Sequence, residues 1–136
     1  MREPKCTPYP PATRYRRKAV RALRFDGDTL TVEIQGEAFA FAHVVFRSLT
    51  AFRVLDERDL CEFWPDYSEP NGWLYEVEQG GWMELEAHRQ LFNSPTIVHS
   101  LKEWLIVDEM CISVLSVQPP EIIDLGSDPE QVGATD

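Results

Sequence analysis

The stretch LTVEIQGEAFAFAHVVF, residues 30–46, decides the fold because its side chains repeat with a period of two. In the first half, Leu30, Val32 and Ile34 alternate with polar residues, which puts one row of side chains on a core face and the other in water. After Gly36 both rows are apolar, so the second half is expected to be a central strand that is covered on both faces. The stretch therefore predicts two antiparallel strands.

Neighbouring segments extend this pair into a larger antiparallel protein. The run VRALRF (20–25) precedes it, and Gly27 between two aspartates can supply the positive φ that a tight hairpin requires. An antiparallel meander is thus expected over residues 20–47. Near the carboxyl end, the β-rich runs KEWLIVDE (102–109) and MCISVLSV (110–117) are expected to pair with each other.

Two more segments have strand patterns. The run FRVLD (52–56) predicts a strand with Phe52 and Val54 facing inward. The runs WLYEVE (73–78) and WMELE (82–86) flank a pair of glycines, which predicts a second hairpin.

Short helices are expected at two places. Asp56 is placed to cap a helix over residues 57–63, which Pro65 would end, and residues 84–92 predict a second helix. Together these elements predict a mainly β protein. We expect a small antiparallel sandwich or partly open barrel of seven or eight strands with one or two short helices.

Composition divides the chain into three parts. Four prolines among the first eleven residues keep the backbone extended and out of a sheet ladder, so residues 1–13 are expected to be a flexible arm. A single β-rich domain is expected over residues 14–125, large enough to need no disulfide or metal. The pair Pro119-Pro120 is expected to stop the last regular element, and residues 126–136 to form a flexible acidic tail.

Charge is distributed unevenly along the chain. Residues 1–24 carry eight basic side chains and one acidic one, a net charge of +7, whereas residues 25–136 carry five basic and 22 acidic side chains, a net charge of −17. The strong negative charge of residues 25–136 repels phosphate backbones and favours a cationic partner. Binding of nucleic acid would rest on the basic segment 14–24 alone and is not expected. We expect this segment to lie on the acidic body of its own or a neighbouring subunit.

No motif for catalysis, metal binding or a cofactor is present. The P-loop, G-x-S-x-G and G-x-G-x-x-G patterns are missing, and no pair of candidate ligands has C-x-x-C or H-x-x-x-H spacing. The three cysteines are far apart and the amino terminus has no apolar signal region, so we expect a cytoplasmic protein with free thiols and no membrane span. The ligand candidates are His43, His88, His99, Cys6, Cys61 and Cys111.

One stretch has the composition of a recognition surface. In DLCEFWPDYSEPNGW, residues 59–73, aromatic rings alternate with carboxylates, and two prolines would hold the loop semi-rigid. Rings supply contact area and carboxylates pair with basic groups of a partner. The expected partner contacts are Trp64, Asp66, Tyr67, Glu69 and Trp73.

Several runs also resemble a known group of proteins. The runs FRVLDERDLCEFW (52–64), WLYEVEQGGW (73–82) and KEWLIVDEMCISVLSVQPPEI (102–122) resemble small bacterial proteins of unknown function, some of them similar to immunity proteins of polymorphic toxin systems. The resemblance covers about half of the chain and implies a small acidic protein that neutralises a basic nuclease toxin.

The function expected from these patterns is a non-enzymatic protein-binding module that takes a cationic protein partner. The alternative is a small enzyme or ligand-binding β-barrel in which His43, Tyr75 and Glu76 line an interior pocket. The sequence leaves open whether the protein is a homodimer.

Overall fold

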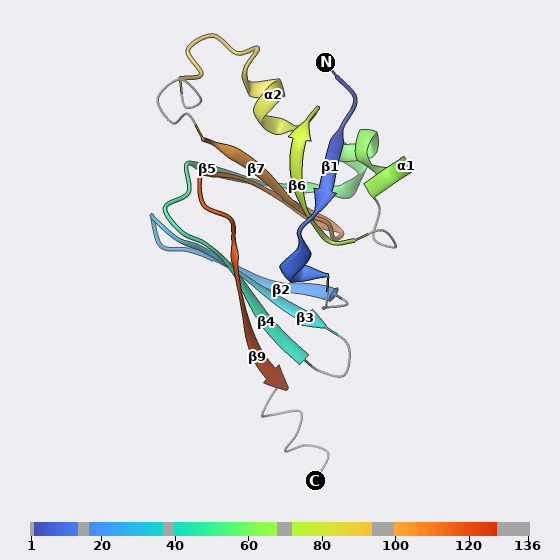
Figure 1. The fold of residues 1–136 in the computed structure, drawn as a ribbon, viewed down its shortest axis with the longest axis vertical. Coiled ribbons are helices and arrows are strands. Elements are labelled where there is room, and N and C mark those ends of the chain that lie inside the picture. The colour runs from blue at the N-terminus through green and yellow to red at the C-terminus, as the bar shows by residue number, and fades with distance from the viewer. Residues whose placement is uncertain (1, 14–16, 37–39, 68–71, 94–99, 128–136) are drawn as a thin grey trace.

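A computed structural model describes residues 2–13, 17–36, 40–67, 72–93 and 100–127. Within these ranges, nine strands form two antiparallel sheets that pack as two layers and do not close into a barrel (Figure 1). The mainly β fold expected from the sequence is therefore confirmed, as an open sandwich.

The four-stranded sheet contains residues 30–46, the stretch with the clearest period of two. Its order is β2-β3-β4-β9, where β2 is Arg17–Phe25, β3 Leu30–Gly36, β4 Ala40–Phe46 and β9 Glu121–Ser127. All neighbours are antiparallel, so the meander is confirmed, with β4 as an inner strand between β3 and β9.

The five-stranded sheet is assembled from distant parts of the chain. Its order is β1-β6-β7-β8-β5, where β1 is Lys5–Pro8, β6 Leu74–Gln79, β7 Lys102–Ile106, β8 Met110–Ser116 and β5 Ala51–Asp56. The pairing of β7 with β8 confirms the predicted hairpin near the carboxyl end.

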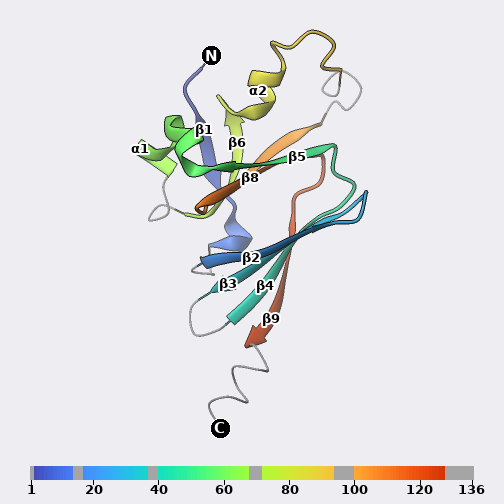
Figure 2. The same ribbon diagram turned by 180° about the vertical axis from the view of Figure 1, so that it is seen from behind.

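Helical segments are short and lie mainly beside the five-stranded sheet. The 3₁₀ helix η3 (Glu57–Phe63) runs into α1 (Trp64–Tyr67), which lies beside β1 in both views, and α2 (Trp82–Glu86) follows β6 (Figures 1 and 2). A further 3₁₀ turn, η1, spans Pro10–Ala12. In the described ranges, no helix has the length and apolar character needed to cross a membrane.

The main core fills the space between the two sheets. Alternate residues of β3 and β4 face alternate residues of β6, β7 and β8, as the period of two requires. This inter-sheet core buries aliphatic side chains and two indoles. Its fully buried members are Ala12, Leu30, Val32, Ile34, Val44, Phe46, Trp73, Leu74, Trp104, Ile106, Ile112 and Val114.

A second, smaller core lies on the other face of the five-stranded sheet. Leu60 and Phe63 of η3 pack onto that face, so the central strands of the sheet are covered on both sides. We call this set the outer core. Its fully buried members are Cys6, Leu60, Phe63, Tyr75, Val77, Leu105, Val107 and Cys111.

Two predictions about burial are wrong. The strand β4 is not covered along both of its faces: Val45 is buried, but Phe41 and His43 in the same row are partly exposed, because no element in the described ranges packs over that part of the four-stranded sheet (Figures 1 and 2). Val54 is exposed rather than inward, because β5 is the edge strand of the other sheet.

The predicted second hairpin is also wrong. The run WMELE forms α2, and β6 pairs instead with β1 on one side and β7 on the other. The helix is favoured because the buried carboxylate of Glu103 accepts the N–H groups of Trp82 at 2.9 Å and Met83 at 2.8 Å. These two donors of the first turn would otherwise lack partners.

Prolines at three places interrupt the regular structure less than predicted. Residues 5–8 pair with β6 despite the prolines around them, because β1 is an edge strand and the missing N–H of Pro8 interrupts little of the ladder. Pro65 lies in the first turn of α1, where its N–H is not needed, so the helix continues past it. The Pro119-Pro120 pair does not end the regular structure, since β9 follows it; residues 128–136 lie outside the described ranges.

Phe46 tests the inter-sheet core. The substitution Phe46→Ala is expected to lower the free energy of unfolding by about 3–5 kcal/mol, because it leaves a cavity between the sheets. The control Phe25→Ala removes the same ring from an exposed position, edge-on to Phe52, and is expected to cost less than about 1.5 kcal/mol. Urea unfolding measures both, and equal losses would contradict this description of the core.

Candidate functional site

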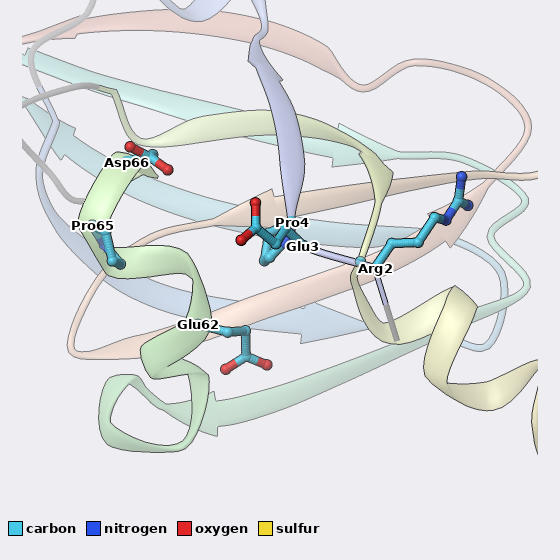
Figure 3. A pocket seen from close by; sticks show the side chains of 7 residues that line it. Arg2, Glu3, Pro4, Glu62, Pro65 and Asp66 are labelled. Carbon is cyan, nitrogen blue, oxygen red and sulfur yellow. The ribbon is translucent and has the colours of Figure 1, made fainter.

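A pocket of about 470 Å³ lies between the N-terminal segment and the η3–α1 segment, on the outer side of the five-stranded sheet. Figure 3 shows Glu3 near its centre, with Asp66 on one side and Glu62 below. We call it the acidic pocket. The residues that line it are Arg2, Glu3, Pro4, Glu62, Pro65, Asp66 and Gly80.

The helical wall of the acidic pocket is positioned by its cap and by burial. The Asp56 carboxylate accepts the N–H of Arg58 at 2.9 Å and begins η3, as the sequence predicted. Leu60 and Phe63 turn into the outer core, which leaves Glu62 on the exposed side of the segment. The same packing that covers the sheet therefore presents the carboxylate to the pocket.

The opposite wall depends on Gly80. A Cβ atom there would lie 2.6 Å from the main-chain oxygens of Arg2 and Glu3, closer than atoms can approach, and its φ of +74° favours glycine as well. The N-terminal segment can thus pass directly over the turn that follows β6. The antiparallel pairing of β1 with β6 continues this contact along the sheet edge.

Carboxylates dominate the charge of the acidic pocket. Glu3, Glu62 and Asp66 line it, and within the described ranges neither Glu3 nor Glu62 forms an ion pair. The lining cation, Arg2, turns its guanidinium away from Glu62 and Asp66 (Figure 3). Concave sites lined by one sign of charge focus the electric field, so this pocket attracts cations.

A second pocket of about 260 Å³ adjoins the first on the α2 side of Arg2. Glu84 of α2 accepts hydrogen bonds there from the guanidinium of Arg2, the shortest at 2.8 Å, and from the N–H of Gly80 at 3.0 Å. The hydrogen bond from Arg2 is the main reason that the pKa of Glu84 is lowered to about 2. Glu84 is therefore a firmly ionised carboxylate.

Glu103 lines the second pocket from beneath and is only 2 % exposed. Burial raises its pKa, while the N–H groups of Met83 and Trp82 and the charge of Arg53 oppose that rise. Burial likewise lowers the pKa of Arg53, whose guanidinium stacks 5.1 Å from the ring centroid of Trp82. This buried acid thus holds the start of α2 against the sheet.

The structure gives the predicted partner contacts different environments. Asp66 lines the acidic pocket, and Trp64 and Tyr67 are half-buried beside it on α1. The Trp64 indole donates to the main-chain oxygen of Glu57 at 2.6 Å. Tyr67 packs edge-on against the buried Tyr75, with ring centroids 5.5 Å apart.

Trp73 cannot serve as a contact. Its side chain is 6 % exposed in the inter-sheet core, and its indole N–H donates to the main-chain oxygen of Ala12 at 3.2 Å. Trp73 is therefore not a partner contact, because its side chain packs between the two sheets. Glu69, the remaining predicted contact, lies outside the described residues.

The alternative pocket of His43, Tyr75 and Glu76 does not form. His43 lies on the outer side of the four-stranded sheet, with Nε2 3.7 Å from Glu33. Tyr75 is sealed in the outer core of the other sheet, where burial raises its pKa to about 12. Glu76 follows Tyr75 on β6 and so faces the opposite way, 3.7 Å from Lys102. Strand parity therefore separates Tyr75 from Glu76, and His43 belongs to the other sheet.

The basic segment lies on the other layer of the sandwich. Residues 17–24 belong to β2, an edge strand of the four-stranded sheet, and residues 14–16 lie outside the described ranges. Arg24 pairs with Glu33 at 2.9 Å, so at least part of the basic charge is balanced by an acid of the same sheet.

The cysteines and candidate ligands form no chemical centre in the described part of the chain. All three thiols are free, and burial raises the pKa of Cys6 to about 12, which keeps it protonated. Among the described residues, no three His, Cys, Asp or Glu side chains are grouped so that they could hold a metal ion.

Comparison of the chain with protein-family models, with curated proteins and with solved structures gave no match. The resemblance to immunity proteins therefore stays a prediction.

Glu84 should make the free energy of unfolding depend on pH in the acidic range. Its pKa is lowered from about 4.5 to about 2 in the folded protein, so its contribution is present above about pH 4.5 and is lost as the pH falls toward about 2. The Arg2→Gln variant lacks the main cause of the shift. We expect the stability gap between wild type and this variant, measured by urea unfolding, to narrow on acidification. A gap that does not change with pH would contradict the assignment.

Glu103 should have the opposite effect. Burial raises the pKa of Glu103 in the folded protein. Its contribution to the free energy of unfolding is therefore fully present when the pH is below its pKa in the unfolded chain, and it is lost as the pH rises through its pKa in the folded protein. Relative to wild type, Glu103→Gln is therefore expected to gain stability as the pH rises above the ordinary pKa of a glutamate, whatever constant cost the lost acceptor adds. Parallel pH profiles of the two proteins would disprove this.

Proposed function

We propose that the protein is a non-enzymatic binding module that captures a cationic protein partner at the acidic pocket. The observation that carries the proposal is the convergence of Glu3, Glu62 and Asp66 on one cavity of about 470 Å³. That volume is within the range of about 300–1,000 Å³ typical of ligand pockets. A lysine or arginine side chain of the partner would enter the pocket and pair with these carboxylates.

Charge supports the same partner class. The net charge of −17 on residues 25–136 attracts a basic protein at long range, which raises the association rate. Pairing inside a concave pocket is less screened by water than pairing on a flat surface. Long-range attraction and the local pocket therefore favour the same ligand.

The rings of α1 provide contact area beside the pocket. Trp64 is fixed by its hydrogen bond to Glu57 and packs against Phe63, with ring centroids 6.3 Å apart. Because it is already ordered, it loses little conformational entropy when a partner covers its exposed side. Trp64 and Tyr67 would then flank the inserted basic side chain, a position where aromatic residues often contribute strongly to binding.

The immunity-like role is the more specific form of this proposal. It makes the partner a basic nuclease toxin and makes the protein its cytoplasmic inhibitor. The resemblance of residues 52–64, 73–82 and 102–122 supports it. Its distinguishing prediction is that the captured partner has nuclease activity and that binding abolishes that activity.

Charge reversal tests the proposed site. The substitution Glu62→Lys is expected to weaken binding of a fluorescent hexa-lysine peptide by about tenfold or more, because it puts a like charge in the pocket. Its matched control is Glu121→Lys, the same change on β9 of the other sheet. Fluorescence polarisation at low and high salt measures both. Equal weakening by the two substitutions, or no binding of the peptide to wild type at low salt, would refute the site.

A capture experiment tests the partner class. Wild-type protein used as bait in an extract of its source organism should recover a basic protein that the Glu62→Lys bait does not. Recovery of the same proteins by both baits would count against the acidic pocket as the contact.

A further inference from the structure

A planar cation already lies at the border of the acidic pocket. The guanidinium of Arg2 donates through Nε to both oxygens of Glu84 at 3.2 Å, through one amino group to Glu84 at 2.8 Å, and through the other to the side-chain oxygen of Gln79 at 3.2 Å. All three nitrogens of the guanidinium thus donate, two of them to Glu84 and the third to Gln79. An ammonium group, which is a compact point charge, would match this arrangement less well.

The wall that receives this guanidinium is held in place by the protein. The N–H of Gly80 fixes one Glu84 oxygen at 3.0 Å, and the absence of a side chain at Gly80 lets an extended segment pass over the wall. The buried Glu103 anchors the first residues of α2, the helix that carries Glu84. The main-chain N–H of Arg2 donates to the other Glu84 oxygen at 3.1 Å, and the Gln79 amide donates to the main-chain oxygen of Glu3 at 3.1 Å. Main-chain groups and a neighbouring side chain therefore hold the acceptors without help from the guanidinium.

The two side chains of this ion pair differ in exposure. The side chain of Glu84 is 19 % exposed, whereas that of Arg2 is 66 % exposed. A second guanidinium in place of that of Arg2 would keep the charge and the hydrogen bonds of Glu84, so the exchange has a small cost. Arg2 also lines both adjoining pockets, so its departure would join them.

We propose that Gln79, Gly80 and Glu84 form an arginine-binding subsite of the acidic pocket, which Arg2 occupies in the free protein and an arginine of the partner takes over on binding. This inference rests on the proposed function and names its ligand chemistry, a guanidinium on an extended segment. Arg2 acts as an internal competitor that keeps the subsite closed to weaker cations.

Removing the competitor tests the inference. The Arg2→Gln variant is expected to bind a fluorescent hexa-arginine peptide about threefold or more tightly than wild type, with a smaller gain for hexa-lysine. The matched control Arg47→Gln also removes an exposed arginine ion pair, to Glu121 at 3.0 Å, but on the other sheet. It should not reproduce the preference for arginine.

A second variant guards against a change in folding. Glu84→Gln removes the subsite itself, so it should reduce binding of hexa-arginine more than binding of hexa-lysine, while Glu121→Gln should not. Thermal melting confirms that each variant is folded.

The outcomes separate this inference from the proposed function. If Arg2→Gln binds hexa-arginine no more tightly than wild type, or gains equally for both peptides, the subsite is refuted. The acidic pocket would stand in that case, provided that Glu62→Lys weakens binding of hexa-lysine by about tenfold or more and Glu121→Lys does not. If no cationic peptide binds any of these proteins at low salt, both proposals fail.

Discussion

The close passage of the N-terminal segment over Gly80 is the contact on which the site depends. It sets β1 against the edge of β6, places Glu3 opposite Glu62 and Asp66, and brings Arg2 to Glu84. The interaction is possible because residue 80 has no Cβ and adopts a positive φ. One glycine therefore connects the sheet edge, the acidic pocket and the α2 wall.

The five-stranded sheet makes this arrangement rigid because both of its faces are covered. The inter-sheet core packs on one face and the outer core, capped by Leu60 and Phe63, packs on the other. The carboxylates on the exposed side of η3 and α1 are consequently fixed in position, because apolar residues of the same segment are buried against the sheet. A site organised in this way needs little rearrangement to accept a basic side chain.

Sequence alone predicted the strands with clear periodicity and the pairing of strands adjacent in the chain, but not the pairing of distant strands. Leu30–Phe46 and the β7–β8 hairpin followed from alternation, and Asp56 was found as a cap. The role of β1 was missed because its pairing with β6 joins residues about seventy positions apart and leaves no local pattern. Asp66 was identified by composition, whereas Glu3 and Glu84 were missed; the Gly80-Gly81 pair, a sign of close backbone approach, was the signal that could have found them.

The most direct measurement is an NMR titration of the ¹⁵N-labelled full chain with hexa-lysine peptide. The account predicts that the largest backbone amide shifts map to Glu3, Glu62, Asp66 and Gly80, around the acidic pocket. Shifts spread evenly over the surface, or concentrated on the four strands β2, β3, β4 and β9, would contradict it.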